Sequence, residues 1–279
     1  MATRSPVINV MARAAEKAAR SLKRDFGEVE QLQVSRKGPG DFVSAADHRA
    51  ESTLREELHK ARPTFGLLLE ESGTIKGSDP SHRWIVDPLD GTTNFLHGIP
   101  HFAISIGLER DGDVVAGVVY DPIKDEMFWA EKGIGAYLND RRLRVSSRRK
   151  LDEALIATGI TARDGAAEDE RAVFVAQVDA ALASVASVRR FGSAALDLAY
   201  VAAGRYEGFW ENHLSPWDIA AGIVLVREAG GYVSEIAGGH DMLTSGSTLA
   251  ANAQLHEPLG DLLRAATKTG DAPRRARSA

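Results

Sequence analysis

The chain has 279 residues with an ordinary globular composition, 44% hydrophobic and 26% charged, which is enough for one large domain or two closely packed lobes. Its formal net charge of -5 argues against a general binder of nucleic acid or anionic membranes, so we expect no direct nucleic-acid partner. It has no cysteine and no apolar run near the ~20 residues of a membrane span, which predicts no disulfide, no membrane anchor and a reducing, cytoplasmic location.

The first half of the chain predicts two helices followed by a largely antiparallel sheet. Ser5 and Pro6 are typical of a helix start, and apolar residues repeat at helical spacing as far as Phe26. A second helix is predicted over 41–63, with Ser44 and Asp47 at capping-box spacing. Strands are then predicted over 65–71 and 82–87, followed by antiparallel strands over 101–140.

The second half alternates strands with helices. Strands are predicted over 154–160, 187–192, 206–211, 232–236 and 247–252, and helices over 168–186, 193–205, 217–231 and 257–267. The fold class is therefore predicted as α+β. We place an N-terminal α+β lobe at 1–147, a C-terminal α/β lobe at 148–267, and a basic disordered tail at 268–279.

The segment WIVDPLDGTT, residues 84–93, carries the chemistry. An apolar strand is predicted to end at Asp87, where Pro88 forces the chain out of the sheet and a tight turn brings Asp90 back to the same side. Gly91 then opens a short helix whose first N–H groups favour an anion. Two carboxylates beside an anion site require a cation, and Mg²⁺ binds carboxylate and phosphate oxygens together. The segment predicts metal-assisted phosphoryl chemistry.

Further carboxylates could join this site. Glu70 and Glu71 end the preceding strand, and only one of them should face the site because side chains alternate along a strand. Asp218 falls in the first turn of a helix, where it could equally act as a cap, and the same alternative holds for Asp47. No histidine or cysteine spacing suggests zinc.

Four segments resemble the inositol monophosphatase family of lithium-sensitive, Mg²⁺-dependent phosphatases, and most closely its bacterial SuhB-type branch. They are DFVSAAD at 41–47, LLEESG at 68–73, WIVDPLDGTTNFLHGIPHFAISIGL at 84–108 and PWDIAAGIVLVREAGG at 216–231. The resemblance implies a layered αβαβα sandwich of the sugar-phosphatase type, a homodimer, and hydrolysis of inositol 1-phosphate to inositol and phosphate.

The resemblance also implies a role for each matching residue. Glu70, Asp87 and the carbonyl group of Leu89 would hold a first Mg²⁺, and Asp87, Asp90 and Asp218 a second. Glu70 would contact a third, weaker ion through water, giving two to three ions per subunit.

Catalytic and substrate contacts follow in the same way. Thr92 and Glu70 would position and activate the attacking water, with Asp47 orienting Thr92. Substrate contacts are implied for Asp90, the backbone N–H groups of Gly91 and Thr92, the backbone at Gly192, Ser193 and Ala194, and for Glu211 and Asp218. The segment ENHLSP, residues 211–216, departs from the family pattern of animal enzymes and leaves substrate identity open.

Three alternatives remain. A haloacid-dehalogenase-type phosphatase would use D-x-D-G-T with an aspartate nucleophile, but here two residues separate the aspartates. The same metal chemistry could act on histidinol phosphate, fructose 1,6-bisphosphate or a nucleotide 3′-phosphate. The resemblance to the SuhB-type branch also allows a non-catalytic role that binds the transcription machinery.

Overall fold

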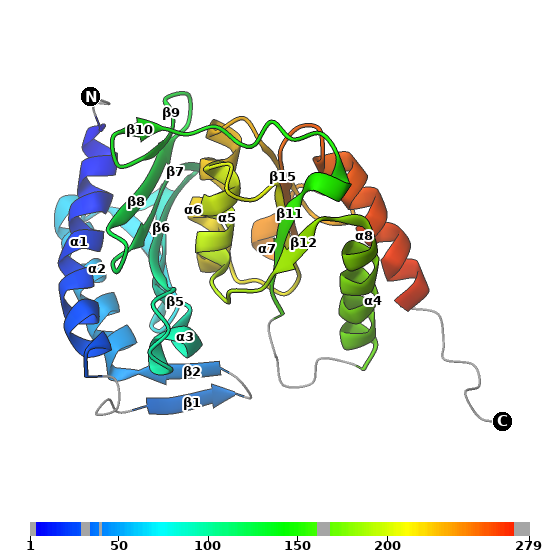
Figure 1. Cartoon of the computed structure of the whole chain (residues 1–279). Helices are drawn as coiled ribbons and strands as arrows, with labels where there is room; N and C mark the ends of the chain where they lie inside the picture. The colour runs from blue at the N-terminus through cyan, green and yellow to red at the C-terminus, as the bar shows by residue number, and fades with distance from the viewer. Residues whose placement is uncertain (1–3, 29–33, 39–40, 161–167, 271–279) are drawn as a thin grey trace.

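The computed structural model describes residues 4–28, 34–38, 41–160 and 168–270, which form five layers (Figure 1). The outermost layer holds α1 (Pro6–Phe26) and α2 (Ala45–Ala61). Ser5 caps α1 as predicted, since its side chain accepts a hydrogen bond from the N–H group of Ile8 at 3.2 Å. The apolar faces of both helices pack on one face of a large sheet and form one of the hydrophobic cores.

The large sheet has the strand order β10-β9-β8-β7-β6-β5-β3-β4. Only β3 and β5 pair in parallel among these neighbours; the others are antiparallel. The strands are β3 (Phe65–Leu69), β4 (Gly73–Ile75), β5 (Asp79–Asp90), β6 (Ala103–Arg110), β7 (Asp113–Asp121), β8 (Glu126–Glu131), β9 (Gly135–Leu138) and β10 (Arg141–Arg142).

The central layer consists of α5 (Ala194–Ala202) and α6 (Pro216–Glu228), which lie between the large sheet and a second sheet (Figure 1). The second sheet has the order β12-β11-β13-β15-β14. Both helices are buried almost all round, because each packs against sheet on two sides. The strands are β11 (Leu155–Thr158), β12 (Ser187–Arg189), β13 (Gly208–Glu211), β14 (Tyr232–Ser234) and β15 (Thr248–Ala251).

The last layer is α4 (Glu168–Ser184) with α8 (His256–Gly270), which cover the outer face of the second sheet (Figure 1). Smaller elements are β1 (Val34–Gly38), β2 (Asp41–Ser44), α3 (Thr92–Leu96), α7 (Met242–Ser245) and a 3-10 turn at Leu151–Glu153. The five layers confirm the predicted αβαβα sandwich. The division at residues 147 and 148 stays a prediction.

Several predicted boundaries are wrong. The strand predicted over 187–192 ends at Arg189, and the helices predicted over 193–205 and 217–231 end at Ala202 and Glu228. Residues 41–44 pair with β1 as strand β2, so the second helix starts only at Ala45. Strand β5 continues to Asp90 rather than ending at Asp87, because its pairing with β6 resumes after a bulge. Helix α8 extends to Gly270 and includes the first three residues of the expected tail; residues 271–279 lie outside the described residues. In the described part of the chain, no helix is both long and apolar enough to cross a bilayer.

Candidate active site

Glu70 and Asp87 lie side by side at the ends of two neighbouring strands. Strands β3 and β5 are parallel, and Leu69 pairs with Val86. The next residue along each strand is therefore Glu70 on one side and Asp87 on the other, and side chains at matching positions of a sheet share a face. The negative charge of Glu70 contributes, after burial, to raising the pKa of Asp87. Of the two glutamates in sequence, Glu70 thus faces Asp87.

Asp90 returns to the same side because β5 is irregular after Asp87. The pairing with β6 stops at Asp87 and resumes at Asp90, so Pro88 and Leu89 form a bulge. The N–H group of Leu89 donates to Asp87 Oδ1 at 2.8 Å and stabilises the bend. Gly91 follows in the left-handed region, at φ 95°. A Cβ atom there would lie 3.1 and 3.3 Å from two backbone oxygens, so the tight turn favours glycine.

Asp218 reaches this site from the first turn of α6. Its Oδ2 atom accepts a hydrogen bond from the N–H group of Ser215 at 2.6 Å, which confirms the predicted capping interaction. Helix α6 approaches the large sheet closely because Gly107 and Gly117 pair in register beneath it. A Cβ atom on Gly117 would lie 2.8 Å from Ala221 Cα. The capping hydrogen bond and the close packing of α6 on the large sheet together fix the position of Asp218.

Asp87, Asp90 and Asp218 form a compact carboxylate cluster. One carboxylate oxygen from each lies within 4.8 Å of the other two. Burial raises the pKa of all three, and the charges of Glu70, Asp90 and Asp218 raise the pKa of Asp87 further. The pKa of Asp90 rises to about 6, although hydrogen bonds to its carboxylate oppose the effect.

This crowding of negative charge is unfavourable unless a cation neutralises it. Oxygen atoms of carboxylates are the ligands that Mg²⁺ prefers, and three of them converge here. The chemistry of the donor set therefore fits a site for a hard divalent cation.

The hydroxyl group of Thr92 is held beside the cluster at the start of α3. Thr92 Oγ1 lies 3.2 Å from Asp47 Oδ1 and 3.0 Å from the carbonyl oxygen of Leu89, and its single hydrogen can be donated to either. The other oxygen of Asp47 accepts hydrogen bonds from Ser44 N at 2.8 Å and Ser44 Oγ at 2.6 Å. Asp47 is fully buried. It therefore caps α2 and orients Thr92 at once.

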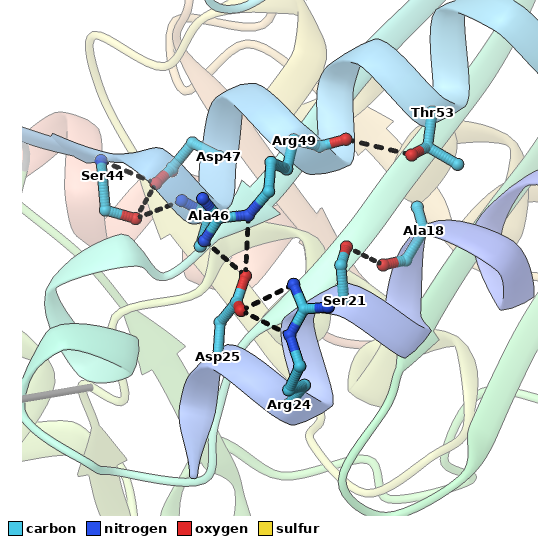
Figure 2. A network of polar contacts seen from close by, with 9 residues as sticks. All are labelled: Ala18, Ser21, Arg24, Asp25, Ser44, Ala46, Asp47, Arg49 and Thr53. Atoms are coloured by element: carbon cyan, nitrogen blue, oxygen red, sulfur yellow. Dashed lines mark hydrogen bonds and ion pairs between the residues drawn. The ribbon is translucent and has the colours of Figure 1, made fainter. Parts of the chain in front are cut away.

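A group of ion pairs fixes the start of α2 against α1 (Figure 2). The buried carboxylate of Asp25 accepts from Arg49 Nη2 at 2.7 Å and Nε at 3.2 Å, and from Arg24 Nε at 3.1 Å. Arg49 lies on α2, within one turn of Asp47. Arg49 therefore ties the helix that carries Asp47 to α1, and Asp25 would keep its contact with Arg24 if Arg49 were removed.

The loop before α5 is attached to the carboxylate cluster by hydrogen bonds. Asp90 Oδ2 accepts from Ser193 Oγ at 2.5 Å and from Ala195 N at 2.8 Å. Asn94 Nδ2, on α3, donates to the carbonyl oxygen of Phe191 at 2.7 Å. Residues 192–194, whose backbone the family resemblance implies in substrate contact, are therefore fixed next to Asp90. The side-chain role of Ser193 was not expected from the sequence.

Glu211 ends strand β13 on the same side of the molecule. It is buried, with 7% of its surface exposed. Its charge contributes to the raised pKa of Asp218, after burial and the charges of Asp90 and Glu70. It also contributes to the raised pKa of Asp197, a carboxyl group on α5 that is 1% exposed. Glu211 therefore lies near enough to Asp218 for its charge to act on that residue, and its contact with substrate stays a prediction.

Two buried carboxylates near the site were missed in the sequence. Asp197 lies in the apolar run AALDLAYVA, and a lone acid in such a run is a signal that could have revealed it. Glu51 accepts hydrogen bonds from Glu71 N at 2.8 Å and from the Ser72 hydroxyl group, and so holds the turn that follows Glu70. No sequence signal separates Glu51 from the other charged residues of α2.

Comparison with known proteins shows the class to which this layered fold and its carboxylate cluster belong. The profile of the inositol monophosphatase family matches residues 3–268. The inositol-1-monophosphatase of Mesorhizobium japonicum is 57% identical over 92% of this chain and 95% of that protein. The Nus factor SuhB of Escherichia coli K12 is 42% identical over 93% and 99%.

Solved structures agree. The extragenic suppressor protein SuhB of Bartonella henselae is 55% identical, with a TM-score of 0.89 over 93% of this chain and 99% of that one. The inositol monophosphatase of Anabaena is 35% identical, with a TM-score of 0.81 over 93% and 95%. The chain therefore belongs to the inositol monophosphatase family, a family of phosphatases.

Proposed function

We propose that the protein is a Mg²⁺-dependent phosphomonoesterase that hydrolyses inositol 1-phosphate to inositol and phosphate. The convergence of three carboxylate oxygens within 4.8 Å, with Glu70 beside them, carries this proposal. The relatives named inositol-1-monophosphatase, at 53–57% identity, support the choice of substrate.

The cation sites are assigned from the donor groups. Glu70, Asp87 and the carbonyl oxygen of Leu89 would hold one ion, and Asp87, Asp90 and Asp218 another. Two to three ions per subunit are proposed, because Glu70 would also contact a third through water. Bound Mg²⁺ would lower the pKa of water and neutralise charge that builds on the phosphoryl and leaving oxygens.

The attacking water is positioned by residues of this chain. The Thr92 hydroxyl group donates toward Asp47 or Leu89 and keeps lone pairs with which to accept a hydrogen bond from water. Glu70 takes the proton as the new bond from oxygen to phosphorus forms. The bond from phosphorus to the ester oxygen breaks, and the released alcohol takes a proton from solvent.

The phosphate and alcohol ends of the substrate would occupy different parts of the site. The N–H groups of Gly91 and Thr92, at the start of α3, would receive phosphate oxygens. Residues Asp90, Glu211 and Asp218, with the backbone of 192–194, would contact substrate hydroxyl groups. Their burial and mutual proximity support this assignment.

The test is hydrolysis of a panel of phosphate esters with Mg²⁺ and with EDTA. The panel contains inositol 1-phosphate, histidinol phosphate, fructose 1,6-bisphosphate and a nucleoside 3′-phosphate. We expect Mg²⁺-dependent release of phosphate with the highest kcat/KM for inositol 1-phosphate. Preference for another ester would reject the substrate and retain the chemistry, and trapping of a phosphoryl group on Asp87 would reject the water mechanism.

A second candidate function is binding to the transcription machinery. It is favoured by relatives named Nus factor SuhB at 41–44% identity. Complementation of a deletion strain distinguishes the candidates: Asp87→Asn should fail if catalysis matters and should succeed if binding alone matters. Homodimer formation and inhibition by lithium remain predictions that rest on the family resemblance, and cytoplasmic location remains one that rests on the absence of cysteine.

A further inference from the structure

The backbone conformation at residue 159 does not require glycine. Its φ angle lies outside the left-handed region, so any residue could adopt its conformation. The space beside it is nonetheless occupied. A Cβ atom built on Gly159 would lie 2.0 Å from Glu211 Oε2, 2.4 Å from Cδ and 2.5 Å from Oε1. The carboxylate group of Glu211 therefore sits where a side chain of residue 159 would begin.

The sheet register explains this contact. Strands β11 and β13 run parallel, and Thr158 pairs with Trp210. The hydroxyl group of Thr158 donates to the carbonyl oxygen of Trp210 at 2.8 Å and holds the two strand ends together. Gly159 and Glu211 are the next residues of the two strands, so they are neighbours at the edge that faces the carboxylate cluster.

The atoms that a Cβ atom at residue 159 would meet form the end of the long Glu211 side chain. Rotation about the side-chain bonds of Glu211 can move them without displacing backbone. A methyl group at position 159 should therefore leave the fold intact and move the carboxylate group. This differs from Gly117, where the added atom would meet the backbone of α6.

We propose that Gly159 is a positioning residue for Glu211: its missing side chain provides the space that fixes the Glu211 carboxylate, and this sets the preference for phosphate esters that carry hydroxyl groups. The inference rests on the proposed function, in which Glu211 contacts the alcohol part of the substrate. Gly159 itself touches no substrate.

The experiment compares Gly159→Ala with wild type on two esters. Inositol 1-phosphate carries hydroxyl groups on the alcohol side, and p-nitrophenyl phosphate carries none. A hydrogen bond to a charged group contributes about 1.5–3 kcal/mol, so kcat/KM for inositol 1-phosphate should fall about tenfold or more, mainly through KM. The value for p-nitrophenyl phosphate should change by less than about twofold, because phosphate and water are held by other residues.

Three further variants show whether the effect acts through Glu211 and whether it is specific to position 159. Glu211→Ala removes the carboxylate, and in that background Gly159→Ala should cause no additional loss for inositol 1-phosphate. Gly66→Ala is the matched control, since an added Cβ atom there would meet its nearest neighbours at an ordinary 3.4 Å. Gly66→Ala should leave kcat/KM unchanged for both esters. Thermal unfolding of each variant shows whether it is folded.

The outcomes separate the two proposals. Equal losses of kcat/KM for both esters in Gly159→Ala, or additive losses in the double variant, would overturn the role of Gly159. So would unchanged kinetics in Gly159→Ala while wild type hydrolyses inositol 1-phosphate. If wild type hydrolyses neither ester with Mg²⁺, the proposed function itself fails.

Discussion

Replacement of Asp90 by asparagine should stabilise the metal-free protein at pH 8 but not at pH 4. The pKa of Asp90 rises from 3.8 to about 6 on folding, chiefly because the group is buried. A carboxyl group whose pKa is raised on folding stabilises the folded state only while it is protonated. Its contribution is complete below pH 3.8 and is lost as the pH rises through about 6.

The magnitude follows from the two pKa values. At ~1.36 kcal/mol per pKa unit, ionisation of Asp90 lowers the free energy of unfolding by about 2 kcal/mol between pH 4 and pH 8. Asparagine does not ionise, and its carbonyl oxygen can accept the hydrogen bonds from Ser193 and Ala195 that Asp90 Oδ2 receives. The variant should therefore gain at least about 2 kcal/mol on wild type over this range.

The assay is urea unfolding of both proteins in EDTA at each pH unit from 4 to 8. The difference between the two free energies of unfolding cancels the ionisable groups far from Asp90, while relief of the repulsion on Asp87 and Asp218 adds to it at high pH. Added Mg²⁺ at pH 8 should make wild type the more stable of the two proteins, because wild type binds the ion more tightly. A difference that stays constant with pH in EDTA would refute the reasoning that repulsion and burial strain the metal-free site.

Substitutions at three further positions test separate parts of the account. Thr92→Val should lower kcat by about 10²–10³-fold with a loss of stability of only about 1 kcal/mol, whereas Thr92→Ser should keep most activity, because the hydroxyl group positions the attacking water. Arg49→Ala should lower the free energy of unfolding by about 1–2 kcal/mol in urea, since Asp25 retains Arg24. Gly117→Val should lower the free energy of unfolding by at least about 2 kcal/mol, because the added side chain pushes α6 and Asp218 away from the sheet. It should also weaken Mg²⁺ binding measured by calorimetry. An unchanged Mg²⁺ affinity would contradict the link between this packing and the position of Asp218.

The local features of the site could be predicted from the sequence. The capping box at Ser44, the capping role of Asp218 and the helix that starts after Gly91 are encoded by residues three or four positions apart. The structure confirms them because such interactions form within one turn of chain. The same is true of the amphipathic pattern of α1.

Features that depend on strand pairing could not be predicted. Glu70 meets Asp87 only because β3 and β5 are parallel in one particular register, which local spacing does not give, and only the family resemblance implied this pair. Strand β5 continues past Pro88 because β6 supplies a partner beyond the bulge. The burial of Asp197 likewise depends on how α5 packs between two sheets.

The central claim is that the carboxylate cluster holds Mg²⁺. Calorimetric titration of the purified protein with Mg²⁺, in the presence of inorganic phosphate, tests it most directly. The account predicts saturable uptake of two to three ions per subunit by wild type and a clear loss of affinity in Asp87→Asn. Absence of uptake by wild type, or equal uptake by the variant, would contradict it.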